Sequence, residues 1–249
     1  SLSRTSLDGE TLVINDIESV RRSQWDSSRP TRFITHGWRG QGKTESCTII
    51  RDAYLENFDY NVIVIDWGKI AGSYRYDKVA KSVPTVAQHV ANFINFLKKE
   101  AGLDLSTTKM IGHSLGAHTV GIAARKVHGA IAEVIALDPA KPYFEGNPPG
   151  ERIDATDAKN VQIIHTNAGR LGMQHPVGTS DFYPNGGQKQ AGCSSFDVVG
   201  ACSHSRSFYY YAESIRNPTG FIGSGKDNPY QQAYMGGPNL DPKNKCHTL

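Results

Sequence analysis

The chain contains 249 residues, of which 38% are hydrophobic and 20% are charged, and its formal net charge is +3. This balance excludes disordered and fibrous proteins, and the length allows one large α/β domain or two small ones. No apolar run approaches the roughly 20 residues that cross a bilayer, and no block of Lys and Arg is long enough to predict binding to nucleic acid.

In chain order, short β-branched runs alternate with stretches of helical spacing. Strands are expected at residues 32–35, 61–66, 109–112, 133–137 and 161–166. Helices are expected at residues 45–58, 83–102 and 115–129. This alternation predicts a mostly parallel central sheet with helices on both faces. The tail from Pro218 is rich in Gly, Pro, Asn and Tyr and is expected to be irregular.

A phosphate-loop pattern lies between the first two expected strands. Gly37, four further residues and then Gly42-Lys43-Thr44 fit G-x-x-x-x-G-K-[ST] without a mismatch. Asp66, at the end of the second strand, stands where a carboxylate could hold magnesium. This pattern fixes one more position than the serine motif described next, so it is expected less often by chance. Rarity alone therefore favours nucleotide binding, and the predicted structure around each motif has to decide between the two.

Residues 112–116, Gly-His-Ser-Leu-Gly, match the G-x-S-x-G pattern of a nucleophile elbow. Such an elbow needs a strand, a very tight turn with the serine at its apex, and then a helix, and residues 109–129 are predicted in this order. The small residues Gly112, Gly116 and Ala117 allow the strand and helix to approach closely. The helix start also places positive backbone dipole where an oxyanion would form. Context therefore favours Ser114 as a nucleophile, with a chance Gly/Ser turn as the alternative.

A serine nucleophile needs a base and an acid that orients the base, and here they follow in the order Ser, Asp or Glu, His. Asp138 ends a strand after the serine, whereas Asp66 precedes it. Spacing leaves two histidines open as the base. His165 ends a strand, and His204, which spacing favours, follows Cys202 in the sequence CSHSRS.

Six segments in order resemble the successive motifs of the pancreatic-type lipase family, which includes triacylglycerol lipases and phospholipases A1. They are FITHGW, GHSLGAH, ALDPAKPYF, RIDATDA, DFYPNGG and GCSSFDVVGACSHSRS, and the resemblance covers about residues 32 to 214. It implies an α/β-hydrolase fold in which Ser114 is the nucleophile, Asp138 the acid and His204 the base. His165 then becomes a structural residue at a strand end.

The resemblance also changes the role expected for the glycine-rich segment. By similarity, the His-Gly-aromatic turn is the oxyanion loop, in which the backbone N–H groups of Trp38 and Leu115 would hold the developing negative charge. The glycines then serve a flexible loop, and Asp66 has no magnesium to hold. Nucleotide binding becomes the remote alternative.

The family's lid is expected to be short in this chain. Cys193 and Cys202 align with the cysteines that bracket the lid, so the resemblance implies a disulfide between them. Only eight residues, SSFDVVGA, separate them, and Phe196, Val198 and Val199 are expected to contact an acyl chain or a membrane surface. A lid of this size resembles the phospholipase A1 members more than the digestive triacylglycerol lipases.

The four cysteines, an even number with one close pair, favour two disulfides and a secreted protein. Four reduced thiols in a cytosolic protein are the alternative. By elimination, Cys47 is expected to pair with Cys246 and to tie down the tail.

The segment RIDATDA aligns with a structural calcium site of some family members. Asp154 and Asp157 would be the side-chain ligands, and carboxylate oxygens are the donors that calcium prefers. Two solvated aspartates are the alternative.

The predicted organisation is a single α/β-hydrolase catalytic domain over residues 1–249, with an incomplete N-terminus and without the C-terminal β-sandwich domain of pancreatic lipases. The predicted function is that of a secreted serine ester hydrolase acting on phospholipids (phospholipase A1 type), acylglycerols or both, with no required cofactor. Its partner is a lipid substrate at a membrane or micelle surface, without nucleic acid or colipase. A catalytically weak or inactive lipid-binding or storage homologue is the alternative from another class.

Overall fold

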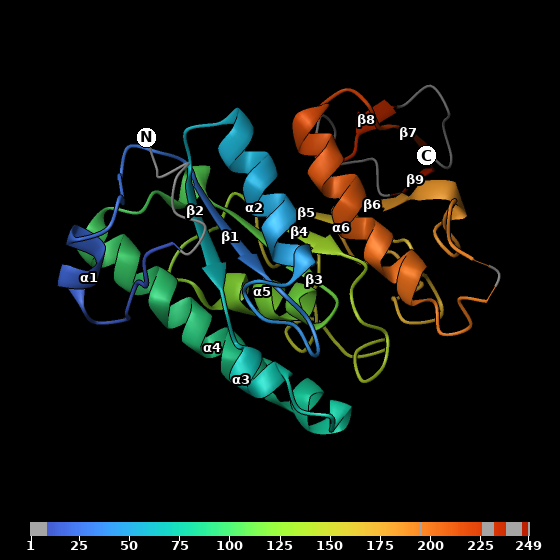
Figure 1. The fold of residues 1–249 in the computed structure, drawn as a ribbon, viewed down its shortest axis with the longest axis horizontal. Helices are drawn as coiled ribbons and strands as arrows, with labels where there is room; N and C mark the ends of the chain where they lie inside the picture. Colours follow the sequence, from blue (N-terminus) through green and yellow to red (C-terminus); the bar gives the residue numbers. More distant parts are fainter. Residues whose placement is uncertain (1–8, 195, 226–231, 238–245, 249) are drawn as a thin grey trace.

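The residues that the structure describes form one nine-stranded sheet in the order β2-β1-β3-β4-β5-β6-β9-β7-β8 (Figure 1). The structure is a computed structural model that describes residues 9–194, 196–225, 232–237 and 246–248. From β2 to β9 every pairing is parallel, whereas β7 pairs antiparallel with both β8 and β9. The strands are β1 (Thr31–Thr35), β2 (Asn61–Ile65), β3 (Lys109–His113), β4 (Glu133–Leu137), β5 (Asn160–Ile164), β6 (Ser180–Tyr183), β7 (Ile222–Gly225), β8 (Gln232–Tyr234) and β9 (Cys246–Thr248).

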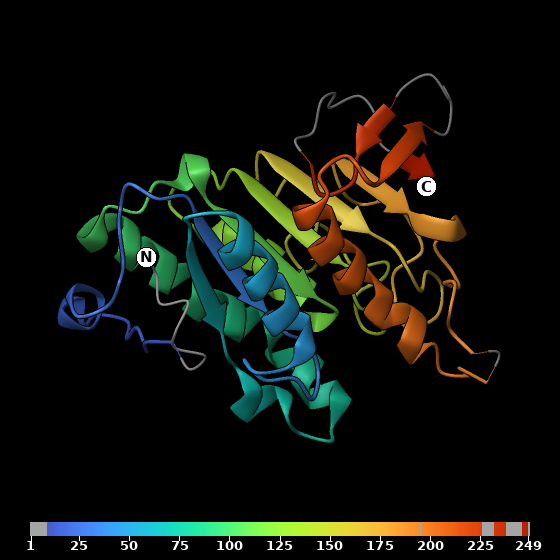
Figure 2. The ribbon, with the colours of Figure 1, turned by 45° about the horizontal axis from the view of Figure 1, so that its top comes forward.

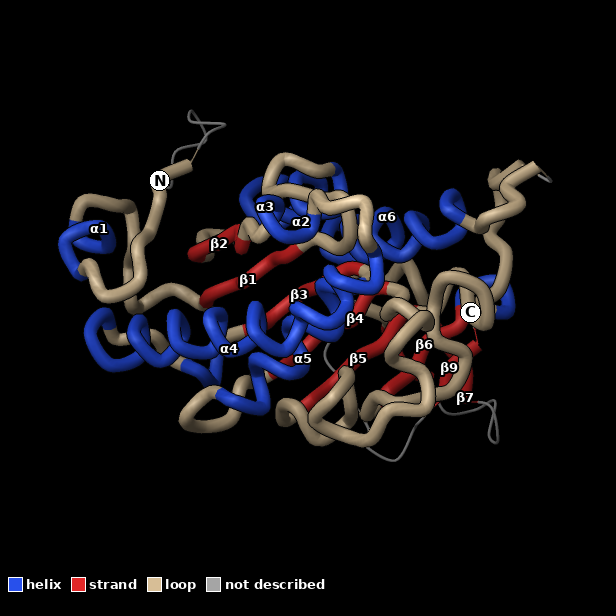
Figure 3. Tube along the Cα trace, turned by 90° about the horizontal axis from the view of Figure 1, so that it is seen from below, coloured by secondary structure: helices blue, strands red, loops and turns tan. Residues whose placement is uncertain are grey.

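Two pairs of helices cover the two faces of this sheet. The helices are α1 (Ile17–Arg21), α2 (Glu45–Asn57), α3 (Gly68–Ala71), α4 (Tyr76–Ala101), α5 (Leu115–Lys126) and α6 (Ala201–Arg216), with short 3-10 helices η1 (Leu105–Thr107) and η2 (Pro184–Gly186). Figure 3 shows α4 and α5 on one side of the strands and α2 and α6 on the other. No helix within the described ranges is long and apolar enough to cross a membrane.

Alternation along the strands separates the core into two layers. Phe33, Met110 and Val134 pack with the helices α4 and α5, and the next residue of each strand points to the opposite face, where α2 and α6 lie. Because both faces are covered, β2, β4 and β5 read as runs rich in Ile and Val. Each of the five expected strands lies within two residues of its predicted bounds. The parallel sheet with helices on both faces confirms the predicted α/β-hydrolase fold.

Helix α4 begins earlier than its sequence pattern predicts. The expected start at residue 83 places Pro84 in the first turn of the helix, a position that suits proline. In the structure α4 begins at Tyr76 and continues through Pro84. Val79 and Val83 are buried in the preceding turns, so they continue the apolar face, and their burial offsets the backbone hydrogen bond that proline removes.

The prediction of an irregular tail after Pro218 is wrong. Strands β7, β8 and β9 extend the sheet beyond β6, as the red strands of Figure 2 show. They contain three or four residues each, too few for an alternating pattern to stand out. Backbone hydrogen bonds in the ladder that begins at β6 stabilise these strands, although their own strand propensity is weak.

The predicted disulfide between Cys47 and Cys246 is also wrong. Cys47 is a free, buried thiol in α2, which packs on β1 and β2. Strand β9, which contains Cys246, lies five strand positions from β1, or roughly 24 Å at the usual strand spacing. A disulfide requires Cα atoms within about 7 Å.

We expect the Cys47 thiol to be inert in the folded protein. Burial raises its pKa to about 12, so the reactive thiolate is scarce. Iodoacetamide at pH 8 without reductant should leave Cys47 unmodified in the native protein and should alkylate it after denaturation, as read by peptide mass spectrometry. A Cys47 peptide recovered in disulfide linkage from a non-reducing digest would contradict this assignment.

Candidate functional site

Ser114 lies at the apex of a strained turn between β3 and α5. Its backbone angles, φ 58° and ψ −120°, are rarely adopted by a residue with a side chain. A Cβ atom on Gly112 would overlap the Gly116 backbone, and one on Gly116 would overlap the His36 carbonyl. Both positions therefore require glycine, and their close packing holds the serine at the carboxyl edge of the sheet.

Asp138 follows β4, the strand beside β3, and its carboxylate is fully buried. Oδ1 accepts hydrogen bonds from the backbone N–H groups of Thr166, at 2.8 Å, and Asn167, at 2.9 Å. Oδ2 lies 2.5 Å from Nδ1 of His204. Gly172 leaves no room for a Cβ beside this carboxylate, so its orientation is fixed by contacts on every side.

His204, in the first turn of α6, lies beside the end of β3, where the expected nucleophile Ser114 follows. The bond to Asp138 assigns the hydrogen to Nδ1 and leaves Nε2 as the basic nitrogen. The His204 ring centroid is 4.5 Å from that of His113, the residue before Ser114. The described residues include no hydrogen bond between the Ser114 hydroxyl and His204, a contact that in apo enzymes often closes only with substrate.

His113 supports His204 without competing as a base. Its Nε2–H donates to the His204 carbonyl at 3.2 Å, and its ring packs edge-on against Phe208. Burial, and then the neighbouring His204, lower the pKa of His113 well below its usual range. Residue 113 therefore stays neutral and fixes the start of α6.

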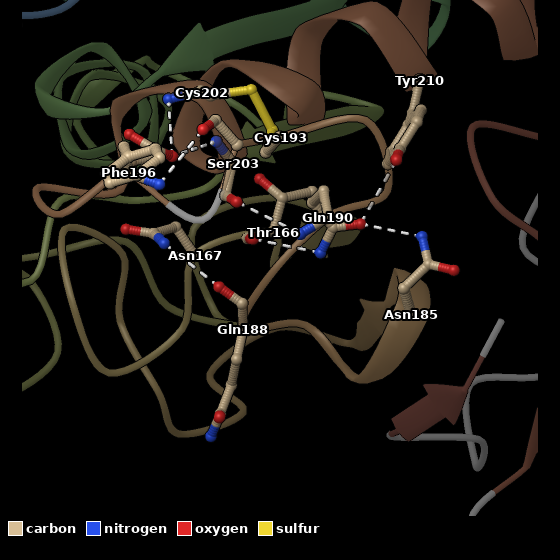
Figure 4. Close-up of a disulfide and its surroundings, with 12 residues drawn as sticks. Thr166, Asn167, Asn185, Gln188, Gln190, Cys193, Phe196, Cys202, Ser203 and Tyr210 are labelled. Carbon is tan, nitrogen blue, oxygen red and sulfur yellow. Dashed lines mark hydrogen bonds between the residues drawn. A yellow bond between two sulfur atoms is a disulfide. The ribbon is translucent and has the colours of Figure 1, made fainter.

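The lid joins this helix through two connections (Figure 4). Cys193 and Cys202 form the expected disulfide, with Cα atoms 5.7 Å apart. Asp197 Oδ2 accepts from the backbone N–H groups of Cys202, at 3.1 Å, and Ser203, at 3.3 Å. This carboxylate caps α6, whose N-cap residue Gly200 has no side chain to do so.

Gln190 is a supporting residue that sequence reasoning missed. Its Nε2 donates to the carbonyls of Thr166, at 3.1 Å, and Pro184, at 2.9 Å, and its backbone N–H donates to Ser203 Oγ at 3.1 Å (Figure 4). Gln190 therefore joins two segments that contact Asp138. One is the loop after β5, whose N–H groups bind the Asp138 carboxylate, and the other is α6, which contains His204. Only its burial distinguishes it, and no motif of the sequence signals it.

The expected oxyanion residues lie against Ser114. A Cβ on Gly37 would lie 2.8 Å from Ser114 Cβ, so this turn passes directly beside the serine. Neither Trp38 N–H nor Leu115 N–H donates to another backbone or side-chain group of the residues described. Two free donors beside a serine can stabilise a tetrahedral oxyanion.

The glycine-rich segment is not shaped as a phosphate cradle, because the backbone N–H groups of Arg39, Gly40, Gln41 and Thr44 already have partners. Gln41 N–H donates to Thr44 Oγ1 at 2.8 Å, and Thr44 N–H donates to the Gln41 carbonyl at 2.8 Å. Burial alone would raise the pKa of Asp66, but N–H donors from Gly68 and Gly42 hold it below its usual range. Asp66 thus anchors the loop.

His165, the other candidate base, contacts residues outside the Ser114–Asp138–His204 group. Nε2 lies 2.8 Å from Asp181 Oδ1, Nδ1 lies 2.9 Å from the Met173 carbonyl, and the ring stacks on Tyr183 at 4.3 Å. Its expected structural role is confirmed.

The two expected calcium ligands face guanidinium groups. Asp157 Oδ1 accepts from Arg125 Nε at 2.8 Å, and Oδ2 accepts from the Asp154 N–H at 2.8 Å. Asp154 Oδ2 lies 3.4 Å from Arg152 Nη1, and Asp154 Oδ1 accepts from the Thr156 N–H. Because these donors occupy the carboxylate oxygens, the arrangement does not fit a calcium ion, which needs six to eight oxygen ligands.

The apolar lid residues point into solvent. The exposed fractions are 87% for Phe196, 79% for Val198 and 67% for Val199. The lid therefore presents an apolar surface next to the helix that carries His204.

His118 joins the loops around the site to α5. Nε2–H donates to the Ala140 carbonyl at 2.8 Å, and Nδ1 accepts from the Ile153 N–H at 3.2 Å. The ring also stacks on Phe144 at 3.9 Å. Burial lowers the pKa of His118 to about 3, so this histidine is neutral in the folded protein.

We expect His118 to make the fold acid-sensitive. Between about pH 6.5 and pH 3, His118 is protonated in the unfolded chain but neutral in the folded chain. The free energy of unfolding therefore falls as the pH falls, by roughly 1 kcal/mol per pH unit. Urea titrations from pH 7 to pH 4 should show a shallower fall in His118→Gln than in the wild type. The control is His89→Gln, since His89 is exposed on α4 and lacks these buried bonds. Parallel pH profiles for all three proteins would contradict this role.

Comparison with known proteins gives one family. A sequence model of the family described as Lipase matches residues 4–249. Pancreatic triacylglycerol lipase of Mus musculus is 36% identical over 237 residues, which cover 87% of this chain and 51% of the relative. Pancreatic lipase-related protein 2 of Cavia porcellus is 34% identical over 220 residues, which cover 86% of this chain and 50% of the relative. The chain thus spans about half the length of these curated relatives.

Comparison with solved structures gives a similarity at low identity. MGS-M1, an α/β hydrolase enzyme from a Medee basin deep-sea metagenome library, is 20% identical with a TM-score of 0.42, covering 60% of this chain and 61% of that one.

Proposed function

Because the chain belongs to the lipase family, we propose that it hydrolyses carboxylic esters of lipids through Ser114, His204 and Asp138. The observation that carries this proposal is the pair of His204 and the buried Asp138, 2.5 Å apart, beside a serine in a strained elbow. A hydroxyl is a weak nucleophile without an adjacent base. The combination of strain, an oriented imidazole and free N–H donors is costly to maintain without catalysis.

In the proposed mechanism, His204 Nε2 takes the proton of the Ser114 hydroxyl as Oγ attacks the ester carbonyl. Asp138 holds the imidazole in the required tautomer and stabilises its positive charge. The negative oxygen of the tetrahedral intermediate accepts hydrogen bonds from Trp38 and Leu115 N–H. His204 then protonates the departing alcohol, and a water molecule, activated by the same base, releases the fatty acid from the serine. The residues of the chain supply every group that these steps need.

The short lid supports a phospholipase A1-type or acylglycerol substrate presented at a lipid surface. Eight residues closed by a disulfide cannot cover a large apolar cleft, and Phe196, Val198 and Val199 face outward, where they would enter a lipid interface. We further propose one catalytic domain, secreted, since its disulfide suits an oxidising compartment. In this proposal neither colipase, nucleic acid nor a required cofactor takes part.

A lipid-binding homologue without catalysis is the second candidate. The exposed apolar lid alone would suit lipid binding. That role would leave the strained serine and the paired histidine unexplained, so hydrolysis is the stronger proposal.

We expect a lipophilic fluorophosphonate to label Ser114 stoichiometrically, because the reagent reports an activated serine. Intact and peptide mass spectrometry would locate the adduct. Ser114→Ala should abolish both labelling and ester hydrolysis while the thermal unfolding temperature stays nearly unchanged. His204→Gln should slow labelling by at least about 1,000-fold. Folded protein without an adduct would favour the lipid-binding role.

We expect Phe196→Ser to weaken action at surfaces more than action on soluble esters. Removing one exposed aromatic ring from a lipid interface costs about 1.5 to 3 kcal/mol of binding, or roughly 10- to 100-fold in affinity. Hydrolysis of phosphatidylcholine vesicles should fall accordingly, while hydrolysis of 4-nitrophenyl butyrate stays close to wild type. The matched control is Tyr209→Ser, on the outer face of α6. An equal loss on both substrates would place Phe196 in the chemical step instead.

A further inference from the structure

We propose that Arg39 binds the phosphate of a glycerophospholipid whose acyl ester lies at Ser114, which makes Arg39 a specificity-determining residue. This inference rests on the proposed ester hydrolysis and names the substrate class of that site. Its starting point is an exposed cation beside the nucleophile that forms no ion pair with any residue in the described part of the chain.

Arg39 occupies a strained position in the turn that touches the nucleophile. Gly40 N–H donates to the Gly37 carbonyl at 3.1 Å, so residues 37–40 form a four-residue turn, and its third residue, Arg39, has φ 57°. Glycine or asparagine usually takes that position. Two residues span at most about 7.6 Å between Cα atoms, and Gly37 lies against Ser114. Such strain in a long side chain's backbone points to a function.

Aromatic rings, not carboxylates, hold the Arg39 guanidinium. Its Cζ lies 5.0 Å from the ring centroid of Tyr74 and 5.9 Å from that of Trp38. Trp38 is itself fixed, because Nε1 donates to the Ser73 carbonyl at 2.7 Å and its ring packs edge-on against Tyr76 at 5.2 Å. A guanidinium that uses its face in this way keeps its N–H groups, which lie along the edge, available to an anion.

A phosphate ester fits this cation by distance and by chemistry. Only the glycerol carbons separate the hydrolysed ester of a glycerophospholipid from its phosphate. A substrate whose carbonyl lies between Ser114 and the oxyanion donors therefore carries its phosphate within reach of Arg39. Guanidinium binds phosphate through paired N–H···O bonds. A diacylglycerol with the same chains offers no anion at this position.

The nearby arginines are engaged differently. Arg75 pairs with Asp77 through two bonds of 2.8 and 2.9 Å. Arg170 NH1 lies 3.4 Å from the Val198 carbonyl of the lid. Arg39 thus combines a fixed position beside the serine with free donors.

The test uses two monomeric substrates with the same acyl chains, dihexanoyl phosphatidylcholine and dihexanoylglycerol. Below the micelle concentration, charge on a lipid surface cannot contribute. We expect Arg39→Gln to lower kcat/KM on the phosphatidylcholine about 10- to 100-fold, and to lower the ratio of the two kcat/KM values at least about tenfold. Arg39→Lys should recover only part of that ratio, because an ammonium lacks the paired geometry. Arg75→Gln, the matched loss of one charge, should keep the ratio within about twofold of wild type.

Equal losses on both substrates, or no loss on either, would overturn the proposal. A similar change of ratio in Arg75→Gln would overturn it too, because general charge would then explain the preference. Failure of the proposed function is distinct: wild-type protein would hydrolyse neither substrate and Ser114 would not react with fluorophosphonate. Equilibrium binding of a non-hydrolysable diether phosphatidylcholine, against the diether glycerol, still tests Arg39 in that case, and equal affinity of wild type and Arg39→Gln would refute the contact.

Discussion

The buried carboxylate of Asp138 is the interaction on which the site depends. An anion away from water is stable only if its oxygens accept enough hydrogen bonds, and here two backbone N–H groups and one imidazole supply them. These three donors come from the loop after β5 and from α6, which are far apart in the sequence. The need to satisfy one charge therefore brings separate parts of the chain to the same edge of the sheet.

Backbone strain is concentrated around this charge. Six described residues other than glycine have positive φ, and three of them, Asn15, Asp138 and Asn185, are of the types that tolerate it. The other three are Arg39, Ser114 and Tyr143. All three lie in loops that follow β1, β3 or β4. Each costs on the order of 1 to 3 kcal/mol, and the two apolar layers of the sheet must offset that cost.

Local properties of the sequence predicted most of this arrangement. Burial on both faces makes β1 to β5 readable as apolar runs, and the steric demand for small residues makes the serine elbow readable from Gly112 and Gly116. Properties that depend on distant contacts were not readable. Strands β6 to β9 depend on pairing with neighbouring strands. The free state of the Cys47 thiol depends on its distance from the other cysteines, and Gln190 acts only through hydrogen bonds to the groups that surround it.

The lid's carboxylate has a consequence for exchanging substrate specificity between relatives. Asp197 belongs to the loop whose apolar residues face outward, yet it caps the helix that contains His204. Under the proposed function, recognition and chemistry are therefore not separate modules in this chain. A lid transplanted from another protein would need an acid at the same place, or the graft would loosen the start of α6 while changing the surface. The inner side of this lid is in this sense constrained by Asp197, and only its outward-facing residues are free of that constraint.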